Sequence, residues 1–311
     1  MSNALPAHGA RIGIDVGGTF TDFVLFDPRR DTLFYHKQAS TPADPALAVR
    51  DGLAALLAKA GLAADAVALL MHGTTIGLNA IIQRRGARIG LVTSRGFRDI
   101  LEIGRARMPS SFDFHATREE PFLPRDRVLE IDARLNARGE PTRTPSAAQL
   151  DEVAAAVHAL QVDAVALVLI NGYANAGFER EIAAQLQSRL AGTPVLSAAA
   201  IWPEIREYER TLVAGLNAYI QPLMQAYLSR LRAHCDSIGV RAPIFVTASN
   251  GGSLGLESAR ERPIDTVLSG PAAGVMAATR LATHGGIEQI ITFDMGGTSS
   301  DIAVSVAGQP E

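Results

Sequence analysis

The stretch DVGGTFTD, residues 15–22, has a near copy in DMGGTSSD, residues 294–301. Both read Asp-x-Gly-Gly-Thr-x-[Thr/Ser]-Asp with the same internal spacing, and an apolar run precedes each. A glycine pair between two such runs predicts a tight hairpin, because glycine readily adopts the positive φ that hairpin turns use. The segments TDFVLFD and TLFYHKQAS extend the first hairpin into a predicted antiparallel meander. The repeat therefore predicts two related half-molecules, each opened by a strand–turn–strand unit.

Both turns carry the residue types that bind phosphate. A glycine-rich turn presents backbone N–H groups without obstruction, and the threonine adds a hydroxyl. An aspartate at the end of the first strand repels phosphate, but it can hold a hydrated Mg²⁺ that bridges phosphate oxygens, or position a water. We therefore predict that Asp15 and Asp294 are catalytic and metal-binding. The predicted phosphate-binding residues of the two turns are Gly17, Gly18, Thr19, Thr21, Gly296, Gly297 and Thr298.

Each part of this interpretation has an alternative. A single copy of the motif is explained equally well as a simple hairpin, and it is the second copy that favours a ligand site. Asp22 and Asp301 either contact the ligand or brace their turns. Other nucleotide motifs are absent from the sequence: no glycine is followed by lysine, and no two glycines are separated by one residue. ATP binding would therefore depend on the paired hairpins.

The composition excludes several classes of protein. The chain has 311 residues, of which 47% are hydrophobic, and a net charge of −3. This gives ample material for a core and no basic excess, so no nucleic-acid partner is expected. The single cysteine, Cys235, excludes an intrachain disulfide framework, and nothing indicates secretion. Apolar runs such as residues 164–170 are too short to cross a bilayer. We expect a cytoplasmic protein with no membrane contact.

Helical and strand patterns alternate along the chain, which predicts an α/β fold. The clearest helix covers residues 44–62, with Asp44 as its N-cap. Residues 105–148 are rich in arginine and proline and lack periodicity, which indicates a long loop or an inserted segment. A long helical region covers residues 204–239, where Pro222 is expected to kink or divide it.

Two further segments suggest ligand contacts. His72 follows a predicted buried strand, a usual position for ligand contacts in α/β folds, and is predicted to be catalytic, as an acid/base group or by orienting a phosphate. A hydrogen-bonded structural histidine is the alternative. The run SGPAAG looks like a glycine-rich turn that leads into a helix, where an anion could bind at the helix N-terminus. Tight helix packing explains its small residues equally well. The residues predicted to line the pocket on these grounds are Thr74, Thr75, Asn79, Ser269 and Gly270.

At this level the chain resembles known proteins. The twin hairpins resemble those of the sugar kinase, Hsp70 and actin superfamily of ATPases. More narrowly, the chain resembles the N-terminal portion of the hydantoinase A / 5-oxoprolinase family. The motifs that carry this resemblance follow the family's order and are GIDVGGTFTDFVLFD, HGTTIGLNAIIQRRGARIGLVTSRGFRDILEIGR (72–105), WPEIREYERTLVAGLNAYIQPLM (202–224), SNGGSLG (249–255), LSGPAAGVMAA (268–278) and FDMGGTSSDIAV (293–304).

The resemblance implies both a fold and a domain division. The fold would be an α/β, ribonuclease H-like (actin-like ATPase) domain with an inserted segment, followed by the first hairpin of a second such domain. Residues 1–200 would form the N-terminal domain and residues 201–311 the start of the hydantoinase A/oxoprolinase domain. Family members are about twice this length, so the chain is expected to be truncated after its second hairpin.

The resemblance also implies a reaction, which is the ATP-dependent hydrolysis of a cyclic amide such as 5-oxoproline or a hydantoin. ATP and Mg²⁺ would be the cofactors, and phosphorylation would activate the amide carbonyl. Such chemistry needs mainly positioning and charge neutralisation. A hydantoinase B-type subunit, or the missing C-terminal half, would be the partner. The alternatives are a subunit of an ATP-dependent ketone carboxylase, a non-catalytic remnant or assembly partner, and a small-molecule kinase.

Overall fold

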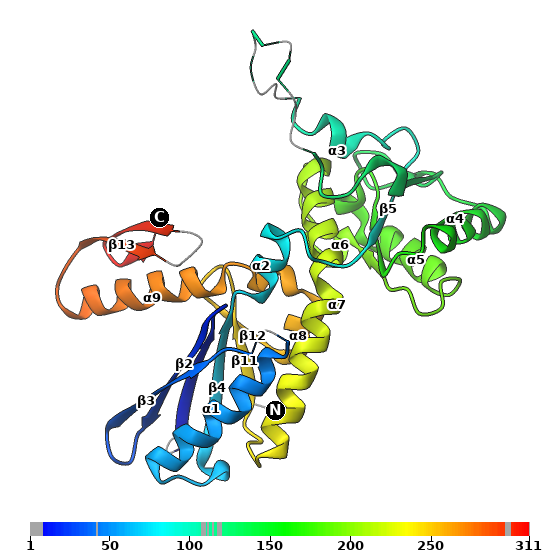
Figure 1. The fold of residues 1–311 in the computed structure, drawn as a ribbon. Helices are drawn as coiled ribbons and strands as arrows, with labels where there is room; N and C mark the ends of the chain where they lie inside the picture. The colour runs from blue at the N-terminus through cyan, green and yellow to red at the C-terminus, as the bar shows by residue number, and fades with distance from the viewer. Residues whose placement is uncertain are drawn as a thin grey trace. The chain divides into compact units, whose positions relative to one another are not determined.

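The computed structural model describes residues 9–41, 43–106, 110, 112–113, 115–116, 120–295 and 300–310. The chain forms two compact units (Figure 1): unit 1 comprises Met1–Ala80 and Leu223–Glu311, and unit 2 comprises Ile81–Pro222. The units are defined by packing, so they do not test the predicted family domains over residues 1–200 and 201–311. Unit 1 combines the two ends of the chain, and unit 2 is formed by the segment between them.

Unit 1 contains a six-stranded mixed sheet in the order β12-β11-β4-β1-β2-β3. The predicted meander is confirmed, because β2 is antiparallel to both β1 and β3. β4 and β11 extend the sheet as parallel strands, and β12 is antiparallel to β11. The strands are β1 (Ala10–Val16), β2 (Phe20–Asp27), β3 (Thr32–Ala39), β4 (Val67–Thr74), β11 (Ile244–Thr247) and β12 (Ser253–Gly255).

Helix α1 (Pro45–Ala60) packs against β2 and β3. The predicted N-cap is confirmed: the side chain of Asp44 accepts a hydrogen bond from the Ala46 N–H at 3.2 Å. The helix passes so close to the sheet that a Cβ at Gly52 would lie 2.3 Å from Cζ of Phe23. Alternate side chains of β1 and β2 are buried and form the core on one face of the sheet, namely Ile12, Ile14, Val16, Phe23 and Leu25.

Unit 2 is built on a four-stranded parallel sheet in the order β10-β9-β5-β6. Its strands are β5 (Ile89–Ser94), β6 (Val128–Ile131), β9 (Ala164–Val168) and β10 (Val195–Ser197), and its core includes residues of helices α4 (Ala147–Leu160) and α5 (Ala176–Gln187). The prediction of irregular structure over residues 105–148 is wrong for the second part of that segment. β6 and the ribbon β7 (Arg134–Leu135)–β8 (Pro141–Arg143) lie there. A four-residue strand carries almost no periodicity, and β6 is defined by its pairing with β5.

Helix α7 runs from Glu207 to Ser237 without interruption. Pro222 lies inside it, so the helix is not divided there, although the unit boundary falls at this proline. The remaining helices are α2 (Ile76–Ile82), α3 (Ile100–Ile103), α6 (Ala198–Ile201), α8 (Leu256–Glu261) and α9 (Ser269–His284). No helix in the described part of the chain is long and apolar enough to cross a membrane.

The chain ends, within unit 1, in a second small antiparallel sheet of β13 (Gln289–Met295), β14 (Ser300–Val306) and β15 (Gln309–Pro310). This sheet lies beside α9 (Figure 1), and the Ser305 hydroxyl is 2.6 Å from that of Thr279 on the helix. The predicted second hairpin is therefore present. Its turn residues Gly296, Gly297 and Thr298, all predicted to bind phosphate, lie outside the described residues.

Candidate functional site

The first hairpin turn is formed by residues 17–19 and is held by backbone bonds. The Gly17 N–H donates to the Phe20 carbonyl at 3.0 Å. Neither Gly17 nor Gly18 has a positive φ, so the conformational reason expected for the glycine pair is wrong. Space is the reason at Gly17, where a Cβ would lie 3.0 Å from the Phe20 carbonyl oxygen. Gly18 faces open space, and its lack of a side chain leaves the backbone of the turn accessible.

Ser40, just beyond β3, braces this turn from behind. Its hydroxyl donates to the Gly17 carbonyl at 2.8 Å, and its N–H donates to the Thr19 carbonyl at 2.9 Å. The hydroxyl of Thr21 lies 3.1 Å from that of Ser40, and Thr21 is fully buried. The structure therefore gives Thr21 a bracing position on the core face in place of the predicted phosphate contact. Ser40 lies outside the repeated motif, so the motif did not point to it.

Asp15 and Asp22 are directly paired across β1 and β2. Side chains of paired residues point to the same face of a sheet, so the first and last residues of the motif lie together. On the other side of β1, Asp15 is paired with Gly73 of β4. A Cβ at Gly73 would lie 3.2 Å from Oδ1 of Asp15. Gly73 therefore makes room for this carboxylate, a role that a glycine inside a predicted strand could have signalled.

The electrostatic environment of Asp15 disfavours its ionised form. Desolvation raises the pKa of Asp15, and the nearby charges of Asp22 and Asp294 raise it further. Asp22 has its own counter-ion, because Nζ of Lys37 lies 3.0 Å and 3.1 Å from its two carboxylate oxygens. No hydrogen bond or ion pair of this kind is made by Asp15 among the described residues.

This arrangement fits a magnesium ion. A carboxylate that lacks a protein cation and lies near two other carboxylates is relieved of repulsion when a divalent cation binds. The described residues contain no cluster of three or more possible metal ligands. Mg²⁺ bound with a nucleotide does not need such a cluster, because one or two carboxylates, waters and phosphate oxygens complete its shell. Asp15 and Asp294 are the residues that would hold it.

The end of β4 lies beside the end of β1. The N–H and the hydroxyl of Thr75 both lie 3.4 Å from the Val16 carbonyl oxygen, to which they donate. The side-chain amide of Asn79 donates to the Thr75 hydroxyl at 3.2 Å. The Thr74 hydroxyl accepts from the Ile76 N–H at 3.2 Å and thereby starts helix α2. These residues lie next to Asp15, but their hydroxyls are used in holding the strand end.

Helix α9 begins at the same strand end. Ser269 is fully buried, accepts from the Thr74 N–H at 3.4 Å and donates to the Thr74 carbonyl at 3.2 Å. Ser269 and Gly270 are the first two residues of this 16-residue helix, so the expected turn before the helix is wrong. Pro271 fits in the first turn because the N–H groups there have no partner within the helix. A Cβ at Gly270 would meet only the Thr75 methyl carbon, at 3.9 Å, so packing does not require glycine there.

His72 lies on the opposite face of the sheet from Asp15. It is paired with Ile14 and Val246, and it is fully buried. Its Nε2 lies 2.8 Å from the hydroxyl of Tyr227, and burial lowers the pKa of His72 to about 4. A neutral, buried histidine on the core side favours the structural alternative over the predicted catalytic role. Successive residues of a strand face opposite sides of the sheet, so His72 faces the core while its neighbour Gly73 lies on the side of Asp15.

The second hairpin repeats the register of the first. Asp294 is paired with Asp301, as Asp15 is with Asp22, and Met295 is paired with Ser300, as Val16 is with Thr21. The environment of the two hairpins differs. The core positions of the first hairpin are buried, whereas the matching positions of the second are exposed, namely Ile291, Phe293, Met295, Ile302 and Val304.

Comparison with known proteins gives this geometry a context. The profile of the hydantoinase/oxoprolinase N-terminal region matches residues 11–190, and the hydantoinase/oxoprolinase profile matches residues 210–311. The chain is 36% identical to the caprolactamase subunit alpha of Pseudomonas jessenii over 96% of its own length and 44% of that protein. It is 27% identical to the 5-oxoprolinase of Dictyostelium discoideum over 94% of its own length and 26% of that protein.

Comparison with solved structures identifies the same group of ATP-dependent enzymes. The nucleotide-free structure of acetone carboxylase, an ATP-dependent enzyme, aligns with a TM-score of 0.86 at 25% identity, over 96% of this chain and 44% of that one. The ATP-dependent caprolactamase of Pseudomonas jessenii aligns with a TM-score of 0.83 at 34% identity, over 94% of this chain and 43% of that one. The chain thus spans less than half the length of the relatives it matches. With the twin hairpins in place and both profiles matched, the chain belongs to the hydantoinase/oxoprolinase family.

Proposed function

We propose that this chain is the nucleotide-binding part of an ATP-dependent hydrolase of cyclic amides. The observation that carries the proposal is the repeated hairpin, in which Asp15–Asp22 and Asp294–Asp301 occupy the same register. The similarity to a caprolactamase subunit and to a 5-oxoprolinase supports a lactam-type substrate of the 5-oxoproline, hydantoin or caprolactam class. The sheet order β3-β2-β1-β4-β11, with only β2 antiparallel to its neighbours, supports the predicted ribonuclease H-like fold.

The residues of the site have distinct tasks in this proposal. The backbone of the turn at Gly17, Gly18 and Thr19 binds phosphate oxygens, and the N-terminus of α9, where no side chain provides a cap, adds a partial positive charge. Asp15 orients the metal or a water, and Gly73 keeps the carboxylate in place. Mg²⁺, when bound, neutralises the charge that develops on the phosphates. Phosphorylation of the amide oxygen makes the ring carbonyl reactive toward water.

The partner and the compartment are part of the proposal. The chain covers less than half of its relatives, and two of them, a caprolactamase alpha subunit and an acetone carboxylase beta subunit, are subunits by name. We therefore expect activity to require a hydantoinase B-type subunit or a C-terminal half. The cofactors in this proposal are ATP and Mg²⁺, and the compartment is the cytoplasm. A subunit of an ATP-dependent ketone carboxylase is the second candidate, because acetone carboxylase gives a TM-score of 0.86.

Two measurements test the proposal. The first is the affinity of the chain for ATP with and without Mg²⁺, measured by calorimetry for the unaltered chain and for Asp15→Asn. The second is ATP hydrolysis with 5-oxoproline, hydantoin and caprolactam, in the presence of the candidate partner. Hydrolysis stimulated by a cyclic amide supports the first candidate, and stimulation by a ketone with bicarbonate supports the second. If the chain binds no nucleotide, with or without the partner, both enzymatic candidates are refuted and a role in assembly is the remaining alternative.

A further inference from the structure

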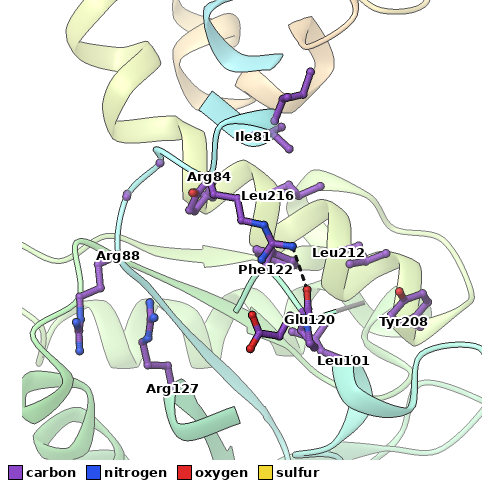
Figure 2. A pocket seen from close by; sticks show the side chains of 15 residues that line it. Ile81, Arg84, Arg88, Leu101, Glu120, Phe122, Arg127, Tyr208, Leu212 and Leu216 are labelled. Atoms are coloured by element: carbon purple, nitrogen blue, oxygen red, sulfur yellow. Dashed lines mark hydrogen bonds between the residues drawn. The ribbon is translucent and has the colours of Figure 1, made fainter. Parts of the chain in front are cut away.

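Unit 2 contains a cavity of about 710 Å³ that includes none of the hairpin residues. That volume is in the range of small-molecule sites. The cavity lies between α7, α3 and the segments that lead into β5 and β6, and Figure 2 shows its lining. Its lining residues all belong to unit 2 and include the arginines Arg84, Arg88 and Arg127 and the rings of Phe122 and Tyr219.

The apolar wall of the cavity is tightly constructed. The rings of Phe122 and Tyr219 pack edge to face, with 6.3 Å between their centroids. Each ring occupies space that a glycine leaves open: a Cβ at Gly86 would lie 2.2 Å from the Tyr219 ring, and a Cβ at Gly215 would lie 2.6 Å from the Phe122 ring. The Ala87 N–H also donates to the Tyr219 carbonyl at 2.8 Å. The rings are therefore fixed before any ligand arrives, which lowers the entropic cost of binding.

The opposite side of the cavity carries positive charge. Arg88 and Arg127 immediately precede the paired strands β5 and β6, so their side chains emerge at the same edge of the sheet and lie near each other in Figure 2. Nε of Arg88 donates to the Leu160 carbonyl at 3.1 Å, a neutral acceptor. Within the described residues, Arg127 makes no side-chain hydrogen bond or ion pair. The single acidic residue of the lining is Glu120, against three arginines.

Two guanidinium groups beside an aromatic and aliphatic wall select a particular ligand chemistry. A carboxylate satisfies the guanidinium donors in a forked geometry, while a ring or branched chain attached to it packs against Phe122 and Leu216. We propose that this cavity binds an organic carboxylate with an apolar body, with Arg127 and Arg88 holding the carboxylate. The site is additional to the proposed nucleotide site, and its ligand class follows from the lining alone.

The test compares three probes by calorimetry on the full chain: naphthylacetate, its neutral isostere naphthylacetamide, and acetate. Naphthylacetate should bind about tenfold more tightly than naphthylacetamide, because only the acid pairs with the arginines. Acetate should bind more weakly than naphthylacetate by at least a similar factor, because it leaves the apolar wall uncovered. Arg127→Gln should remove the preference for the acid and leave naphthylacetamide unchanged, whereas Leu216→Ala should weaken both naphthyl probes.

Arg138→Gln is the matched control, since Arg138 is an exposed arginine of the same unit outside the cavity. Arg127→Lys, which keeps the charge, should retain part of the preference, and circular dichroism confirms folding of each variant. Equal affinity for acid and amide, or an equal response of Arg127→Gln and Arg138→Gln, would overturn the proposal. Nucleotide binding measured in the same samples reports separately on the hairpin site, so the two proposals fail independently.

Discussion

Ile12 and Ile291 provide a matched pair of probes, because each lies three residues before the first aspartate of its hairpin motif. Ile12 is 1% exposed, whereas Ile291 is 74% exposed. We predict that Ile12→Ala destabilises unit 1 strongly and that Ile291→Ala has little effect. The two substitutions are chemically identical and differ only in what covers the side chain.

The magnitudes follow from burial. Replacing isoleucine by alanine removes the equivalent of three methylene groups, worth about 0.8 kcal/mol each when buried, and the cavity left at a closed site adds to this loss. Ile12→Ala should therefore cost about 2–5 kcal/mol in the free energy of unfolding. Since only about a quarter of Ile291 is shielded, Ile291→Ala should cost roughly 0.6 kcal/mol.

The assay is urea unfolding followed by circular dichroism, with amide hydrogen exchange of β1 and β13 as a local measurement. Amide exchange distinguishes a loss of stability of the whole unit from local opening of one hairpin. A cost for Ile291→Ala as large as that for Ile12→Ala would refute the reasoning, because it would mean that the apolar face of the second hairpin is covered in solution. A negligible cost for Ile12→Ala would refute the packing of α1 on the first hairpin.

Three further substitutions test other features. Arg210→Met leaves Glu179 buried without the guanidinium 3.5 Å away, and should cost about 3–5 kcal/mol. Burial raises the pKa of Glu179 and the charge of Arg210 lowers it, so removing Arg210 raises this pKa further. Urea unfolding should show the full loss of stability at pH 8. The loss should be smaller as the pH falls toward 4.5, because the Glu179 carboxyl is then protonated in the folded state. Asp15→Asn should reduce amide-stimulated ATP hydrolysis at least ~100-fold. It should also raise the melting temperature at pH 7 but not at pH 3, because the pKa of Asp15 is raised and only its ionised form is disfavoured in the folded state. Gly73→Ala should weaken Mg²⁺-ATP binding on the order of tenfold by displacing that carboxylate, while Gly13→Ala, where a Cβ meets nothing within 4 Å, should not.

Features encoded by neighbouring residues were predictable from the sequence. The hairpins follow from apolar runs around a glycine pair, and the start of α1 follows from Asp44 before a proline. Features that depend on distant residues were not predictable in this way. The two units could not be delimited because unit 1 joins both ends of the chain. Gly73 is needed for a carboxylate 58 positions away in sequence (73 − 15) and paired with it only in the sheet.

The alternation of side chains along a strand explains why the motif could be recognised while some of its residues were assigned the wrong task. Within DVGGTFTD, Asp15 and Asp22 point to one face of the sheet, and their neighbours Val16 and Thr21 point to the other. The motif therefore contains a ligand face and a core face in adjacent positions. Conservation of the spacing between the two copies preserves both faces, so agreement at a position does not by itself show that the residue contacts a ligand. In the second copy, Ser300 at the position of Thr21 is exposed, so the same register does not by itself make this position a core residue.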